Sequence, residues 1–143
     1  MQNIYNAPLS EEETKLRYIT PALENAGWDK KRIRMELYFT DGRVQVHGGK
    51  AKRATGKKAD YLLFWSSNQP LAIVEAQKYD TMTGDGMDQA LDYAQTLDVP
   101  FAYTSNGKNF LEHDLLTGKE RTLSMEEFPS PEDLWQRFRQ ARA

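Results

Sequence analysis

The stretch DYLLFWSSNQPLAIVEAQ, residues 60–77, contains two short apolar runs, and each run has a carboxylic acid at one end. Asp60 opens the first run, residues 61–65, and Glu75 closes the second, residues 71–74. Short apolar runs separated by turn residues are typical of buried strands. If these two strands are neighbours, they present both carboxylates at one edge of a sheet.

Alternation along the second strand decides which side chains accompany Glu75. Side chains of a strand point alternately to its two faces, so Glu75 and Gln77 point one way and Ala76 and Lys78 the other. Mg²⁺ in proteins is bound by one or two carboxylates, completed by water and phosphate oxygens. The pattern therefore predicts a metal-dependent site for cutting a phosphodiester. Acids at strand ends that pair with basic residues would give the same pattern.

Composition favours one soluble globular domain. The chain has 143 residues, 39% of them apolar and 28% charged, which is typical of a folded domain. No apolar stretch approaches the roughly 20 residues of a membrane span, and the first residues do not resemble a signal peptide, so no membrane partner is expected. The absence of cysteine excludes disulfides and thiolate zinc sites, and it fits a cytoplasmic protein.

Basic residues are concentrated in one segment although the net charge is −2. Residues 50–58 contain five basic side chains and no acid: Lys50, Lys52, Arg53, Lys57 and Lys58. Such clusters make salt-sensitive phosphate contacts with nucleic acid. A solvated loop is the alternative.

Helix signals occur near both ends of the chain and in its middle. Ser10 and Glu13 form a capping-box pattern, followed by a helix that Thr20-Pro21 kinks or divides and Gly27 ends. Asp85 is expected to cap a helix over residues 87–97, and Ser130 begins a last helix. The apolar side of the first helix is predicted to contain Leu16, Ile19, Ala22, Leu23 and Ala26.

Strand signals fill the remaining segments. Residues 33–39 and 43–47 read as a hairpin around Asp41-Gly42, and residues 99–104 as a strand that returns through residues 110–114. Together with residues 61–65 and 71–76 they predict an α/β domain with a small mixed sheet flanked by helices. The helix over residues 87–97 would then connect two parallel strands.

In this order, the segments resemble the amino-terminal endonuclease domain of type I restriction enzyme R (HsdR) subunits, within the PD-(D/E)xK nucleases. The resemblance covers nearly the whole chain and is carried by residues 19–23, 27–28, 58–61, 73–76, 84–93, 98–101, 105–107 and 128–135. It implies a restriction-endonuclease-like core. In that family an ATP-dependent DNA translocase follows the nuclease, and this chain has no G-x-x-x-x-G-K-[ST] phosphate loop. We therefore expect residues 1–143 to be a single nuclease domain excised from a larger motor-containing subunit, with ATP used only in the motor.

The resemblance also implies roles for the acids and their neighbours. Asp60 and Glu75 would jointly hold Mg²⁺, with Mn²⁺ as a substitute and the Ala76 carbonyl as a further ligand. Gln77 departs from the family, which usually has lysine there to orient the attacking water. Loss of one such preorganised donor costs on the order of 10²–10³ in rate. Lys78 is adjacent, but only a bulge would turn it toward the site.

Further positions match the family less distinctively. Gln89 and Tyr93 match a Q-x-x-x-Y motif that places DNA or the carboxylates, although they could equally cover the sheet. From the basic segment rather than the resemblance, Lys52, Arg53 and Lys58 are expected to contact DNA. Glu13 matches an acidic position near the metal, but a capping box explains it as well.

Three functions remain open from the sequence. The first is an Mg²⁺-dependent endonuclease domain that cuts double-stranded DNA within an ATP-driven type I restriction complex, together with methyltransferase and specificity subunits. The second is a DNA-binding or docking module of the same fold, whose cutting is impaired by Gln77. The third is an unrelated α/β domain with incidental acids.

Overall fold

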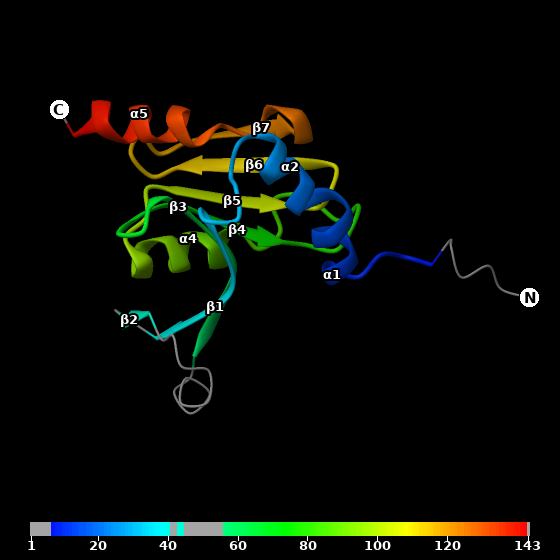
Figure 1. The fold of residues 1–143 in the computed structure, drawn as a ribbon. Helices are drawn as coiled ribbons and strands as arrows, with labels where there is room; N and C mark the ends of the chain where they lie inside the picture. Colours follow the sequence, from blue (N-terminus) through cyan, green and yellow to red (C-terminus); the bar gives the residue numbers. More distant parts are fainter. Residues whose placement is uncertain (1–6, 41–42, 45–55, 143) are drawn as a thin grey trace, which may run out of the picture.

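The computed structural model describes residues 7–40, 43–44 and 56–142, and seven strands in this part of the chain form one sheet (Figure 1). Their order across the sheet is β2-β1-β3-β4-β5-β6-β7. Strands β4 and β5 are parallel and the other neighbours are antiparallel. The strands are β1 (Ile33–Thr40), β2 (Arg43–Val44), β3 (Lys57–Ser66), β4 (Gln69–Ala76), β5 (Phe101–Ser105), β6 (Asn109–Asp114) and β7 (Lys119–Ser124). The predicted mixed α/β sheet is confirmed.

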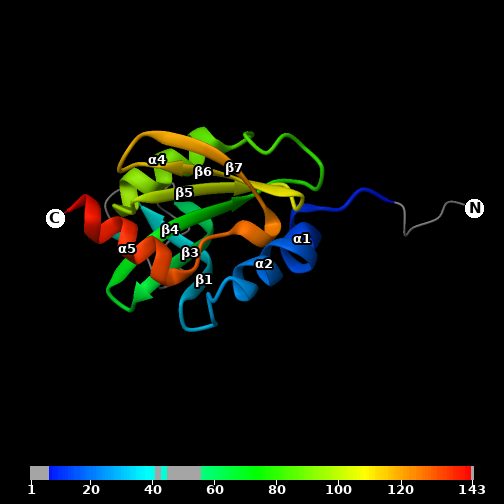
Figure 2. The same ribbon diagram turned by 90° about the horizontal axis from the view of Figure 1, so that it is seen from above.

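Helices cover both faces of this sheet, as Figures 1 and 2 show. On one face, Leu23 of α2 and Leu134 of α5 share a buried cluster with Tyr61. On the other face, Ala90 of α4 packs in a second cluster with Leu62. Because side chains alternate between the two faces of β3, this strand contributes to both clusters. The sheet therefore lies between two layers of helices. The helical elements are α1 (Glu11–Thr14), the π-helical η2 (Lys15–Ile19), α2 (Thr20–Asn25), α4 (Met87–Leu97), the 3₁₀ turn η3 (Met125–Glu127) and α5 (Pro131–Ala141).

Strand β3 begins where β4 ends, because the two strands are antiparallel neighbours. Helix α4 connects β4 to the parallel β5, so the ends of β4 and β5 lie beside the start of α4. Figure 1 shows α1 close to the same end of β4. Asp60 and Glu75 therefore lie at the same end of β3 and β4, between α1 and the start of α4.

The amino-terminal helix differs from its predicted pattern. Lys15 and Ile19 are buried, whereas Leu16 is 75% exposed, so the prediction that Leu16 faces the core was wrong. The π-helical turn over Lys15–Ile19 ends two residues before Pro21, which lacks the N–H that a regular helix would use. Lys15, Ile19 and Leu23, each four residues apart, are buried, as are Thr14 and Ala22 beside them.

The capping box at Ser10 and Glu13 is present as predicted, as is the hairpin of β1 and β2 for residues 43–44. Residues 45–47 of that hairpin lie outside the described part of the chain. Helix α4 begins after Gly86, which has no side-chain cap, so the prediction that Asp85 caps it was wrong. Among the described helices, none is long and apolar enough to span a membrane.

Candidate active site

Asp60 and Glu75 are held by each other's strands. Tyr61 pairs with Val74 in the antiparallel register, which sets Asp60 opposite Glu75. The backbone N–H of Asp60 donates to Oε2 of Glu75 at 2.9 Å, and the N–H of Ala76 donates to Oδ2 of Asp60 at 2.8 Å. Asp60 is 8% exposed and Glu75 is 3% exposed. The fold thus brings two buried carboxylates together in fixed orientations.

This arrangement changes the acidity of Glu75. Burial, followed by the negative charge of Asp60, raises the pKa of Glu75 from 4.5 to about 8. Burial and Asp60 thus favour the protonated form of Glu75 more than in an ordinary carboxylic acid. A divalent ion between the two carboxylates would favour the ionised form, because it offsets both negative charges.

A buried lysine lies against the same pair. Nζ of Lys15 lies 3.1 Å from Oδ1 of Asp60, 2.8 Å from Oε2 of Glu36 and 3.1 Å from Oε1 of Glu12. Burial opposes the charge on Lys15, but its bonds to Glu36 and Asp60 outweigh burial and hold the pKa of Lys15 above its ordinary value. Lys15 is therefore a permanent cation at the site.

Gln77 enters the same hollow from the end of β4. Its backbone N–H donates to the Ser105 carbonyl at 2.8 Å, which continues the pairing with β5. Its side-chain amide lies directly against Gly86, where a β-carbon would have no room. Gly86 has φ +83°, a conformation that favours glycine. Lys78 is exposed and does not line the hollow.

Gln89 and Tyr93 occupy one side of α4 but have different partners. Nε2 of Gln89 donates to Oε1 of Glu75 at 3.2 Å. The Tyr93 ring packs edge-to-face on Phe39 with a centroid distance of 5.0 Å, and Nζ of Lys57 lies 5.9 Å from its centroid. Gln89 thus supports a carboxylate directly, whereas Tyr93 fastens α4 to β1 and β3.

The other predicted positions are distributed around the hollow. Lys58 lines it and pairs with Glu36 at 2.9 Å. Oε1 of Glu13 accepts from the Ser10 N–H at 3.1 Å, and Glu13 does not line the hollow. Glu13 therefore acts as a cap in this structure. Lys52 and Arg53 lie outside the described residues, so their contact with DNA stays a prediction.

The donor set fits a hard divalent cation. Asp60, Glu75 and Ala76 border one polar hollow of about 360 Å³. No group of three or more His, Cys, Asp or Glu side chains suited to a metal occurs in the described part of the chain. Two neighbouring carboxylates match Mg²⁺, which takes one or two carboxylates and keeps several waters and phosphate oxygens as ligands. The Ala76 carbonyl as a further ligand stays a prediction.

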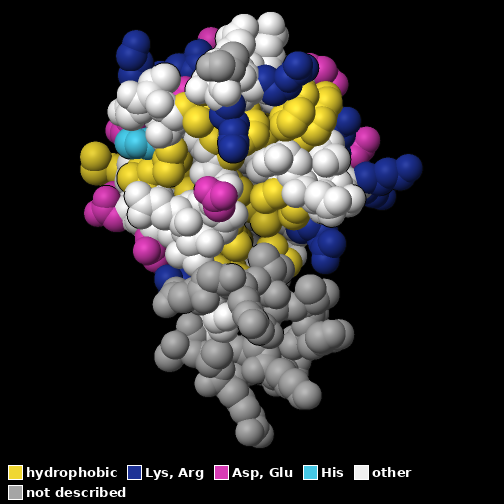
Figure 3. Space-filling view, turned by 90° about the vertical axis from the view of Figure 1, so that its left-hand side faces the viewer, with side chains coloured by type: hydrophobic (Ala, Val, Ile, Leu, Met, Phe, Trp, Pro, Cys, Tyr) yellow, Lys and Arg dark blue, Asp and Glu magenta, His cyan; other side chains and the backbone are white. Residues whose placement is uncertain are grey.

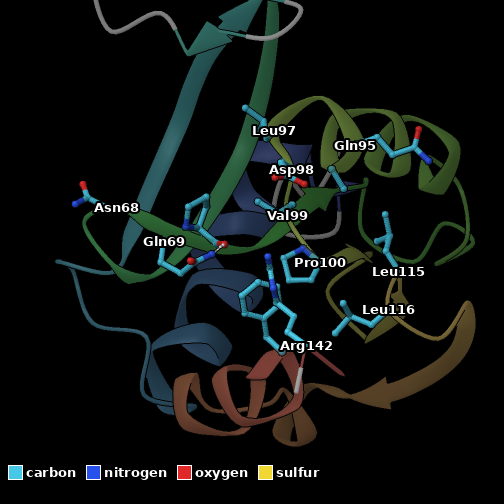
Figure 4. A pocket seen from close by; sticks show the side chains of 13 residues that line it. Asn68, Gln69, Gln95, Leu97, Asp98, Val99, Pro100, Leu115, Leu116 and Arg142 are labelled. Carbon is cyan, nitrogen blue, oxygen red and sulfur yellow. Dashed lines mark hydrogen bonds between the residues drawn. The ribbon is translucent and has the colours of Figure 1, made fainter. Parts of the chain in front are cut away.

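A larger hollow of about 590 Å³ lies at the opposite ends of β4 and β5. Figure 4 shows Gln69, Val99, Pro100 and Arg142 around it, and Figure 3 shows apolar side chains mixed with charged ones at this end of the molecule. Asp98 is the one carboxylate in its lining. Paired acids occur in the smaller hollow, which is therefore the candidate site.

Comparison with known proteins places this chain in a family. Residues 10–129 match the family described as type I restriction enzyme R protein N terminus (HSDR_N). The chain belongs to that family. It is 39% identical over 135 residues to the type I restriction enzyme EcoAI endonuclease subunit of Escherichia coli, which covers 91% of this chain and 17% of that protein.

A solved structure of a similar protein has the same fold as this chain. The fragment described as an HsdR subunit of a type I restriction enzyme from Vibrio vulnificus YJ016 superposes with a TM-score of 0.81 at 41% identity. The match covers 95% of this chain and 26% of that one. The chain therefore spans about a quarter or less of the length of these HSDR_N relatives.

Two residues of the site were missed in the sequence. Lys15 was overlooked because it closely follows the charged first turn of the helix, and Glu36 because it lies in a strand of mixed polarity. The spacing of Lys15 from Ile19 and Leu23, one helical turn each, was the available signal for an inward-facing lysine. Nothing local marked Glu36.

Proposed function

We propose that this chain is the Mg²⁺-dependent nuclease domain of a type I restriction enzyme R subunit, within the PD-(D/E)xK nucleases, and that it cuts double-stranded DNA. The supporting observation is the interlocked pair Asp60 and Glu75 in a polar hollow at the end of two adjacent strands. Membership of the HSDR_N family, and the endonuclease subunit named among its relatives, supports the same reaction class.

Each side chain at the site has a defined task in this proposal. Asp60 and Glu75 hold the cation, and Gln89 keeps Glu75 in place through its amide. Bound Mg²⁺ would polarise the scissile phosphate and lower the pKa of an attacking water. Gln77 offers a neutral hydrogen bond to that water or to the phosphate. The remaining lengths of such relatives would supply the ATP-driven motor, with methyltransferase and specificity subunits as partners.

Plasmid cutting by the assembled enzyme tests this function. The complete subunit, with its partner subunits, ATP and Mg²⁺, should nick supercoiled plasmid, and Asp60→Asn or Glu75→Gln should slow cutting by about 10³-fold. Asp98→Asn, an exposed acid at the opposite end of the sheet, is the matched control and should cut normally. Parental cutting by both site variants would refute the proposal.

A second candidate function follows from Gln77, whose amide is uncharged. The domain would then bind or dock DNA without cutting it. Gln77→Lys separates the candidates: a nuclease gains rate from the new charge, whereas a docking module gains cutting that the parent lacks entirely.

Contact with DNA by the basic segment is a separate prediction. Charge reversal at Lys52 and Arg53 should weaken DNA binding and flatten its dependence on salt. Unchanged binding by that double variant would remove residues 50–58 from the interface.

A further inference from the structure

Lys15 is a buried charge with an unusual position. It is 2% exposed, and its ammonium group contacts carboxylates from three different elements: Glu12 on α1, Glu36 on β1 and Asp60 on β3. A buried lysine is retained only where its charge is matched, because removing it from water is costly. Here two of the three partners are fixed on adjacent strands of the sheet.

Glu36 holds Lys15 in place from a strained backbone position. It has φ 54° within β1, a left-handed conformation that is uncommon for a residue other than glycine. Its strand neighbours Met35 and Leu37 pair with Tyr61 and Ala59, which sets Glu36 opposite Asp60. Its carboxylate accepts from both Lys15 and Lys58. Strain of this kind persists where the surroundings enforce it, and it is concentrated at functional sites.

The lining of the hollow contains four acids and two lysines, Lys15 and Lys58, so acids outnumber basic side chains there. Asp60 and Glu75 together would repel an incoming phosphodiester, and Gln77 adds no positive charge. Lys15 lies in the lining of the same hollow and directly contacts Asp60. Because its ammonium group already contacts Asp60, Lys15 can offset the charge of that carboxylate without rearrangement.

We propose that Lys15, held by Glu36, is a positioning residue of the cutting site: it fixes the Asp60 carboxylate and offsets its negative charge toward the DNA phosphate. This role rests on the proposed nuclease function and deepens it. Lys15 acts through Asp60 and competes with the metal for Oδ1. Removing the Lys15 charge should therefore raise the affinity of the site for a metal ion and lower the rate of cutting.

Lys15→Met, a neutral side chain of similar length, tests this role in the complete subunit assembled with its partners. Without nucleotide, Mn²⁺ binding at the site, defined as the binding that Asp60→Asn removes, should become severalfold tighter because a neighbouring positive charge is gone. The maximal cutting rate should nevertheless fall by about 10²-fold or more. Lys15→Arg should recover part of the rate.

Two further variants control for folding. Lys119→Met removes an exposed lysine on β7 and should change neither measurement. Glu36→Gln keeps Lys15 but weakens its support, and should give a smaller loss of rate with Mn²⁺ binding retained. Thermal unfolding of each variant shows whether the fold is intact.

The outcomes separate this role from the nuclease function itself. If Asp60→Asn cuts like the parent, the nuclease function fails and the Lys15 role with it. If Asp60→Asn is inactive but Lys15→Met cuts at the parental rate, only the Lys15 role is overturned. Joint loss of Mn²⁺ binding, cutting and thermal stability in both Lys15→Met and Glu36→Gln would show that Lys15 is purely structural, which also overturns the proposal.

Discussion

Gln89 and Glu75 are joined across two elements: Nε2 of Gln89 on α4 donates to Oε1 of Glu75 at the end of β4. The other oxygen of Glu75 accepts from the backbone N–H of Asp60. Glu75 is therefore held from two directions, one belonging to the sheet and one to α4. The position of α4 is in this way connected to the orientation of a proposed metal ligand.

Gln89→Ala should slow plasmid cutting by about tenfold. A hydrogen bond to a charged group contributes about 1.5 kcal/mol, and a difference of 1.4 kcal/mol changes a rate about tenfold. Gln95→Ala is the matched control, because Gln95 is also exposed on α4 but lies nearer its far end. Equal rates for both variants would mean that the amide does not support Glu75 in the working enzyme.

Metal affinity should rise with pH up to about 8. Since burial and Asp60 raise the pKa of Glu75 to about 8, a cation that binds below this pH must displace a proton. Mn²⁺ titrations at about pH 6.5 and about pH 7.5 should differ by about tenfold in dissociation constant. Glu75→Gln should bind more weakly and remove this slope. A flat profile for the parent would show that Glu75 is already ionised without metal.

Glu112 is expected to stabilise the attachment of α5 to the sheet. It is 2% exposed and accepts from Arg121 Nε at 2.7 Å, Arg137 Nη2 at 3.1 Å and the Tyr103 hydroxyl at 2.6 Å. Glu112→Gln should lower the free energy of unfolding by about 3–5 kcal/mol, because two arginines lose a buried carboxylate. Glu126→Gln, an exposed acid on η3, is the control.

Glu112 should also make the stability of the fold depend on pH. Burial opposes the charge on Glu112, but hydrogen bonds from Arg137 and Arg121 outweigh burial and hold its pKa below 4.5. An acid whose pKa is lowered in the folded state stabilises fully above its unfolded pKa, and the contribution is lost as pH falls through the folded value. Melting temperatures of parent and Glu112→Gln should therefore converge below about pH 4.5. A constant difference down to low pH would contradict this.

Local patterns in the sequence predicted most elements but not the surroundings of the carboxylates. The Ser10–Glu13 capping box and the helix over residues 87–97 were predictable because each depends on residues within a few positions. β7 was missed: its residues are mostly exposed, and its pairing with β6 defines it as a strand.

The site itself depends on longer-range contacts. Asp60 and Glu75 are 15 residues apart and flank one strand-turn-strand unit, so the apolar runs predicted their meeting. The Lys15–Glu36 pair spans 21 residues and depends on how the amino-terminal helix docks on the sheet edge. The spacing of Lys15 from Ile19 indicates that it faces inward, but nothing local to Glu36 identifies it as the partner of Lys15.

Gly86→Ala tests whether the placement of Gln77 matters for cutting. Gly86 has φ +83°, and a β-carbon there would collide with the Gln77 amide, which would have to move. Gly118 has φ +78°, and a β-carbon at that position would meet nothing within 4 Å, so Gly118→Ala has the same backbone strain without the collision. Each substitution should destabilise the fold by about 1–2 kcal/mol. Plasmid cutting should fall by about tenfold or more in Gly86→Ala alone, because only there is the donor of Gln77 displaced. If the two alanine variants cut equally well at a temperature where both are folded, the position of Gln77 does not limit the reaction.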